Sequence, residues 1–118
     1  MKITIKAGQE TLFATLGENA TAKSFVALLP LELELEDYNQ TEKIAYLPQK
    51  LVTDGAPAGA DPSPGDITYY APWGNLALFY RDFGYSTGLI KIGRIDSGVE
   101  SLRGLRKIKI RIALDSQP

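Results

Sequence analysis

The chain has 118 residues, of which 44% are hydrophobic and 23% charged, a composition typical of globular proteins. A chain of this length can bury a core of its own, so we expect one domain spanning residues 1–118. The formal charge of -1 argues against nucleic acid as the main partner, because phosphate binding requires a basic surplus. The sequence contains no Cys and no His, which excludes disulfides, thiol chemistry and mechanisms that need an imidazole base.

No stretch of the sequence approaches the roughly 20 apolar residues that a membrane-spanning helix requires. Residues 1–6 alternate apolar and polar side chains and carry no apolar run of signal-peptide length. We therefore expect a cytoplasmic protein without a membrane segment. The carboxylates of Asp54, Asp61 and Asp66 lack the spacing of a calcium loop, and we expect neither a metal nor a cofactor.

The first third of the chain predicts a hairpin followed by a helix. Apolar residues in 2–6 and 10–16 flank the turn-like segment Ala7-Gly8-Gln9, which indicates two paired strands. In residues 19–29, Phe25, Leu28 and Leu29 have the i, i+3, i+4 spacing of one helix face. Either Asn19 or Thr21 would cap the start of this helix, and Pro30 would end it.

Residues 31–36 alternate Leu and Glu, which favours a strand over a helix because Pro30 precedes them. The final strand-like run, residues 107–114, alternates Ile with basic residues, and residues 2–6 also carry Lys on one face. Opposite charges on neighbouring strands attract each other. We therefore predict that the two terminal strands are neighbours and that the acidic strand lies beside one of them.

The segment 65–95 holds the single Trp, four of the six Tyr and two of the four Phe. Three strand-like runs, residues 67–70, 76–80 and 89–95, alternate in it with turn residues. A Pro- and Gly-rich segment, residues 54–66, precedes it and predicts a long surface loop.

After it, residues 96–104 predict a short helical turn, with Ser97 and Glu100 as a capping box and Gly104 at its exit. About eight short strands with one helix and one helical turn predict a mainly β fold, a closed or nearly closed antiparallel barrel. An open sandwich is the alternative.

The order of these segments resembles the small prokaryotic cyclophilin-like barrel proteins over nearly the whole chain. The helix, with Thr21, Phe25 and Leu28, is similar to the Thr-x-x-x-Phe-x-x-Leu helix that plugs one end of cyclophilin barrels. Residues 76–80 resemble the strand that places a Phe in the cyclophilin proline pocket. The resemblance implies a closed cyclophilin-like barrel of about eight strands with one plugging helix.

The functional motifs of the isomerases with that fold do not occur here. Those enzymes carry a strand of the form Phe-x-Arg-x-Ile followed by Gln-Gly-Gly-Asp, whereas the corresponding residues 43–48 contain no Arg. The resemblance therefore implies a domain that binds a peptide or a small apolar ligand without strong catalysis, and we assign no catalytic residue. A weak peptidyl-prolyl isomerase is one alternative. A non-catalytic partner of an amide-hydrolysing complex is another, since related barrels occur in amide- and urea-processing enzymes.

Five residues are candidates for a ligand groove beside the expected proline pocket. Alternation on residues 76–80 points Phe79 away from its neighbours, and alternation on 67–70 separates Tyr70 from Tyr69. The turn-like segment 71–75 can bring the indole of Trp73 over the expected proline pocket. Tyr46 ends the strand that corresponds to the one carrying the catalytic Arg in true isomerases. Arg81 is a nearby cation, although a surface ion pair with Asp82 is the alternative. The candidates are Tyr46, Tyr70, Trp73, Phe79 and Arg81.

Overall fold

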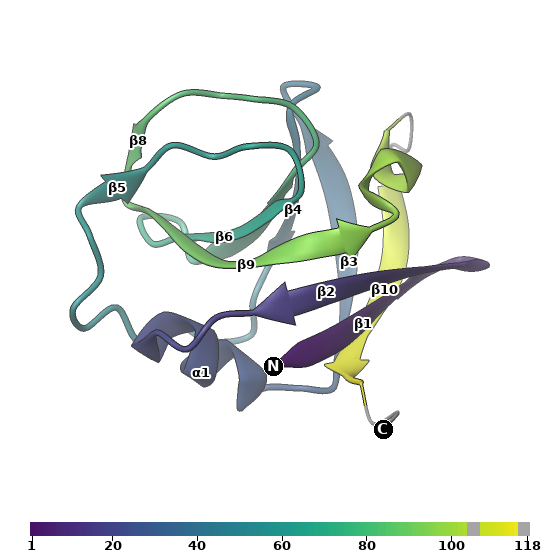
Figure 1. Cartoon of the computed structure of the whole chain (residues 1–118), viewed down its shortest axis with the longest axis horizontal. Helices are drawn as coiled ribbons and strands as arrows, with labels where there is room; N and C mark the ends of the chain where they lie inside the picture. The colour runs from purple at the N-terminus through teal and green to yellow at the C-terminus, as the bar shows by residue number, and fades with distance from the viewer. Residues whose placement is uncertain (104–106, 116–118) are drawn as a thin grey trace.

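The computed structural model describes residues 1–103 and 107–115 (Figure 1). In this part of the chain, eight antiparallel strands close into a barrel in the order β1-β10-β3-β4-β7-β6-β9-β2. Their bounds are β1 Lys2–Ala7, β2 Glu10–Leu16, β3 Leu31–Tyr38, β4 Glu42–Tyr46, β6 Asp66–Tyr70, β7 Asn75–Phe79, β9 Leu89–Ser97 and β10 Lys107–Leu114. The closed barrel confirms the mainly β fold and excludes the open sandwich.

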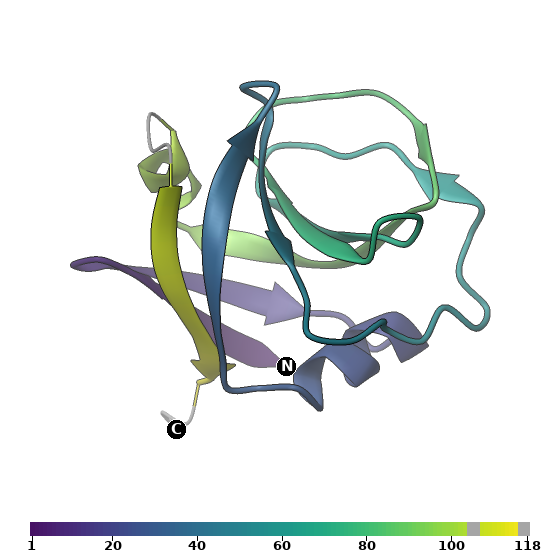
Figure 2. The ribbon, with the colours of Figure 1, turned by 180° about the vertical axis from the view of Figure 1, so that it is seen from behind.

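The expected hairpin and the expected charge complementarity are both present. β1 pairs with β2 around a turn in which Gly8 has a φ of 64°, and β1 also pairs with β10. Strand β10 pairs in turn with β3, and Figure 2 shows these two strands side by side. In this register each basic residue of β10 faces a glutamate of β3: Lys107 opposite Glu36, Lys109 opposite Glu34 and Arg111 opposite Glu32.

The helix α1, Ala20–Val26, covers the lower end of the barrel in Figure 1. Asn19 is its N-cap, and its side chain accepts a hydrogen bond of 2.7 Å from the backbone N–H of Ala22. Phe25 is fully buried against the core, and Leu28 packs there while remaining partly exposed. The helix ends at Val26, and the backbone N–H groups of Leu28 and Leu29 donate to the carbonyl oxygens of Phe25 and Val26 in turns that run up to Pro30.

The aromatic segment divides its side chains between the inside and the outside of the barrel, as strand alternation predicts. Tyr69 and Leu78 belong to the main core inside the barrel. Phe79 and Tyr70 belong instead to a second apolar cluster, which also contains Ile44. Phe79 is nevertheless only 1% exposed, so loops must cover the outer face of the barrel at this point.

Two short strands organise those covering loops. β5, Gly59–Ala60, lies within the predicted long loop and pairs with β8, Ser86–Thr87. In Figure 1 the two loops arch beside β6 and β4. A Cβ atom on Gly59 would lie 2.4 Å from the carbonyl oxygen of Ser86, so a residue without a side chain is needed at this crossing. The loop is therefore held against the barrel instead of standing free.

The predicted helical turn is a 3₁₀ turn, Val99–Leu102, but its cap differs from the prediction. The residue before it is Gly98, with a φ of 96° and no side-chain hydrogen bond, while Ser97 belongs to β9. The predicted capping box is therefore wrong, because Ser97 continues the ladder of β9 with β2. The predicted exit at Gly104 lies outside the described residues. Within the described part of the chain, no helix has the length and apolarity needed to cross a membrane.

Candidate functional site

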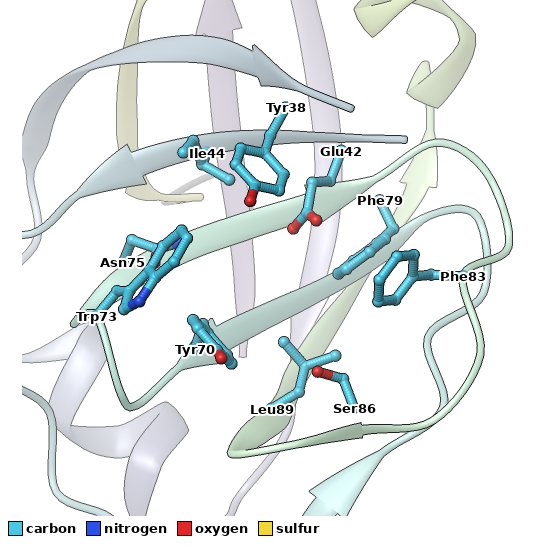
Figure 3. A pocket seen from close by; sticks show the side chains of 10 residues that line it. All are labelled: Tyr38, Glu42, Ile44, Tyr70, Trp73, Asn75, Phe79, Phe83, Ser86 and Leu89. Carbon is cyan, nitrogen blue, oxygen red and sulfur yellow. The ribbon is translucent and has the colours of Figure 1, made fainter. Parts of the chain in front are cut away.

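A cavity of about 180 Å³ lies on the outer face of the barrel, over β4, β7, β6 and the start of β9. Figure 3 shows the side chains that surround it. We call this site the aromatic pocket; it is lined by Tyr38, Glu42, Ile44, Tyr70, Trp73, Asn75, Phe79, Phe83, Ser86 and Leu89. Its volume is below the roughly 300–1,000 Å³ of pockets for drug-sized ligands, so it suits a head group or one side chain.

Aromatic rings form most of the rim of the pocket. The Trp73 indole meets the ring of Tyr38 at 81° with centroids 5.9 Å apart, and the ring of Tyr70 at 82° and 5.4 Å. On the other side, Phe83 packs on Phe79 with centroids 6.1 Å apart. The indole therefore packs on both tyrosines in T-shaped pairs and not in parallel stacks.

Glu42 places a carboxyl group inside this apolar wall. It is the first residue of β4 and pairs with Phe79 of β7 and with Tyr38 of β3, so its side chain lies on the outer face. The residue is 9% exposed, and no described residue hydrogen-bonds or ion-pairs with its carboxyl group. Burial, with a further contribution from the negative charge of Asp37, raises its pKa to about 7.

Asn75 adds a second polar group without a full set of partners. Its side-chain Nδ2 donates to the carbonyl oxygen of Leu76 at 3.1 Å. Its Oδ1 is buried and accepts no hydrogen bond from the described residues. A buried amide oxygen without a donor costs free energy, and this oxygen has almost no accessible surface, so it lies within the wall of the pocket and is not open to a ligand.

On the opposite side of the same strands, a second group of polar side chains is paired within the protein. The ammonium of Lys43 lies 3.2 Å from the carboxylate of Asp37, and the hydroxyl of Tyr80 donates a short hydrogen bond to the same carboxylate. Burial tends to raise the pKa of Asp37, but the hydrogen bonds from Tyr80, Lys43 and the Gln40 backbone bring it below its ordinary value. Burial and the bond to Asp37 raise the pKa of Tyr80 to about 12.

Asp66 is the centre of another ion-pair cluster, on β6 and β9. Its carboxylate lies 3.0 Å from the guanidinium of Arg94 and 3.1 Å from the ammonium of Lys91. It also accepts a hydrogen bond of 2.8 Å from the Ser63 backbone N–H, so it fixes the end of the long loop. Among the described residues, no three acidic side chains gather in a way that could hold a metal ion.

Three of the five predicted groove residues line the aromatic pocket: Tyr70, Trp73 and Phe79. The other two lie elsewhere. Tyr46 is 63% exposed at the far end of β4, and Arg81 is an exposed residue just beyond β7, outside the pocket lining. Pairing of β4 with β7 explains the position of Tyr46, because it places this residue opposite Asn75, at the end of the strands away from Phe79.

The remaining lining residues were not among the candidates, and Glu42 is the most consequential of them. The positions of Glu42 and Tyr46 along β4 differ by an even number, so strand alternation could have placed both side chains on the outer face. Its burial, however, depends on the loop around Phe83 and on Tyr38, which no local pattern reveals. For Ser86 and Leu89 the sequence offered no signal beyond the turn residues at 84–88.

Comparisons with known proteins agree with the architecture. The sequence model of the Cyclophilin-like family matches residues 5–113. The solution structure of a hypothetical protein from Archaeoglobus fulgidus superposes with a TM-score of 0.67 at 16% identity, covering 98% of this chain and 95% of that one. No curated protein matches the sequence significantly. The family match extends over nearly the whole barrel, from β1 to β10, and the chain therefore belongs to the Cyclophilin-like family.

Proposed function

We propose that this protein is a ligand-binding cyclophilin-like domain, whose aromatic pocket holds an apolar or prolyl group of a peptide or small molecule without strong catalysis. One observation carries the proposal. Phe79 points away from the barrel core, yet it is almost completely buried because the outer loops close over it and leave a lined cavity. A surface that served only to pack these loops would be expected to fill that space, since protein interiors contain few voids larger than a water molecule.

The chemistry of the lining favours binding over proline isomerisation. Isomerisation has to overcome a barrier of about 18–20 kcal/mol that arises from amide resonance, and a cation or strong donor at the prolyl nitrogen weakens that resonance. Among the ten lining residues none is Arg or Lys. Each 1.36 kcal/mol of lost transition-state stabilisation lowers the rate about tenfold, so we expect turnover close to the uncatalysed rate.

Binding and catalysis can be measured on the same peptide. We expect a capped Ala-Pro peptide to shift the NMR signals of Trp73 and Phe79, while a protease-coupled assay shows no isomerase rate above the uncatalysed reaction. Phe83→Ala, which removes a half-exposed ring from the pocket, should weaken binding. The matched control is Phe13→Ala, which removes a similarly exposed ring from the outer face of β2.

Two results would overturn this proposal in different ways. The absence of saturable shifts with both prolyl peptides and small apolar molecules would remove the binding function. Efficient isomerisation that Arg81→Ala abolishes would instead identify an enzyme that uses an Arg from outside the cavity.

A further inference from the structure

The aromatic pocket carries a negative electrostatic potential, although most of its lining is apolar. Among its ten lining residues Glu42 is the one acidic side chain, and no described residue forms an ion pair with its carboxyl group. None of the ten lining side chains carries a positive charge. Lys43, the basic residue next to Glu42 in the sequence, lies on the inner face of β4 and is paired with Asp37.

The aromatic walls add to this negative potential. The face of an aromatic ring carries the negative part of its quadrupole and attracts cations, most strongly for Trp. Tyr38, Tyr70 and Trp73 surround one side of the pocket with their rings at steep mutual angles. In Figure 3 the Glu42 carboxylate points into the space between these rings and the two phenylalanines.

From this geometry we propose that the natural ligand presents an alkylated ammonium group, held by the Tyr38, Tyr70 and Trp73 rings and by the Glu42 carboxylate. The inference rests on the proposed binding function and adds a positive charge to it: the alkyl groups of the ligand are the apolar surface that the rings contact, and the charge is what Glu42 recognises. The bound cation would give the Glu42 carboxylate the opposite charge that no described residue supplies.

The alternatives among cations fit less well. A hard metal ion such as Ca²⁺ takes about six to eight oxygen ligands, far more than one carboxyl and one amide oxygen supply. A primary ammonium has three N–H donors that need acceptors, whereas most of this lining is aromatic or aliphatic. An ammonium covered by methyl groups needs no such acceptors, and its methyl groups bury apolar surface against the rings.

The test compares choline with the neutral isostere in which a tert-butyl group replaces the trimethylammonium group, using calorimetry at pH 8. We expect choline to bind about tenfold more tightly than the isostere, because cation–π and carboxylate attraction act on the charged ligand alone. Glu42→Gln keeps the shape of the side chain and should remove most of that preference. The matched control is Glu34→Gln, an exposed glutamate on the outer face of β3 that lies outside the aromatic pocket.

The pH dependence gives a second readout. The ionised form of Glu42 attracts the cation, so choline binding should strengthen as the pH rises through about 7, where its carboxyl titrates. Asp37 on β3 is the charged group that acts on this titration, and Tyr38 and Tyr70 are the other ionisable side chains of the lining. Binding of the neutral isostere should not change over the same range.

The outcomes separate this inference from the proposed function. If choline and the isostere bind equally, or if the preference survives Glu42→Gln, the ammonium inference is wrong while ligand binding stands. If neither compound nor the prolyl peptide binds, both are wrong. If choline is preferred over the isostere, a trimethyllysine peptide identifies the source of the cation: tighter binding than choline assigns it to a protein side chain, and weaker binding to a small molecule.

Discussion

Strand β4 carries two adjacent buried ionisable side chains on opposite faces, and their surroundings differ. Lys43 points to the inside of the barrel, where Asp37 pairs with it and the Tyr80 ring lies 5.8 Å from its ammonium. Glu42, one residue earlier, points to the outside, where the described residues around it are mostly aromatic and none forms an ion pair with it. Among the described residues the inner charge therefore has an ion-pair partner, and the outer charge has none.

This difference separates a face that serves the fold from the face to which we assign the proposed ligand. Removing one partner of a buried ion pair leaves an uncompensated charge, so the inner cluster should contribute to stability. An isolated buried carboxyl costs stability, and a chain keeps such a group at a site where function needs it. The two faces should therefore respond oppositely to mutation.

The largest expected effect lies in the inner core, at the end of the barrel closed by α1. Phe25→Ala should lower the free energy of unfolding by about 3–5 kcal/mol, because Phe25 is fully buried and the barrel cannot collapse into the space it leaves. Phe83→Ala, in the outer pocket, should cost less than about 1 kcal/mol, since its ring is half exposed. Urea denaturation of both variants checks this, and equal losses would contradict the division between the two faces.

A smaller effect is expected at the inner ion pair. Lys43→Met should lower the free energy of unfolding by about 3 kcal/mol, because the partly buried Asp37 carboxylate loses its cation. The double variant Lys43→Met/Asp37→Leu should recover part of this loss, since no unpaired charge then remains. Lys109→Met, on the exposed face of β10, is the control and should change stability little. Additive losses in the double variant would show that the two side chains are not coupled.

The smallest expected effect has the opposite sign. The folded protein holds a proton on Glu42 up to about pH 7, whereas the unfolded chain releases it near its ordinary pKa of 4.5. The folded state thus binds more protons in this window, and the stability contribution of Glu42 falls as the pH rises through it. Glu42→Gln should stabilise the protein at pH 8 by on the order of 1–2 kcal/mol and have less effect at pH 5.

Denaturation curves at both pH values measure this difference. Titration of Asp37 does not contribute to the difference between pH 5 and pH 8, because its lowered pKa changes stability only below its ordinary value of 3.8. Destabilisation by Glu42→Gln at pH 8 would mean that the ionised carboxylate has a partner in solution and would remove the contrast between the two faces of β4.

The sequence by itself determined most of the barrel. Alternation in 31–36 and 107–114 predicted strands with complementary charges, and the register of β3 on β10 confirms it. The spacing of Phe25 and Leu28 predicted the plugging helix. These features depend on the spacing of apolar and charged residues within one strand or one helix, and this spacing can be read directly from the sequence. The same alternation predicted that Phe79 and Leu78 lie on opposite faces, and the structure places Leu78 in the main core and Phe79 in the outer cluster.

Only the tertiary structure decided which polar groups became buried, and with which partners. Arg94 pairs with Asp66, not with the surface acids near it in sequence, because the β6–β9 register brings these two residues opposite each other. Glu42 is buried because the end of β3 and the loop around Phe83, distant in sequence, close over the same side of β4. Alternation fixes the face on which a side chain lies, but the desolvation that shifts its pKa comes from non-local segments packed over that face.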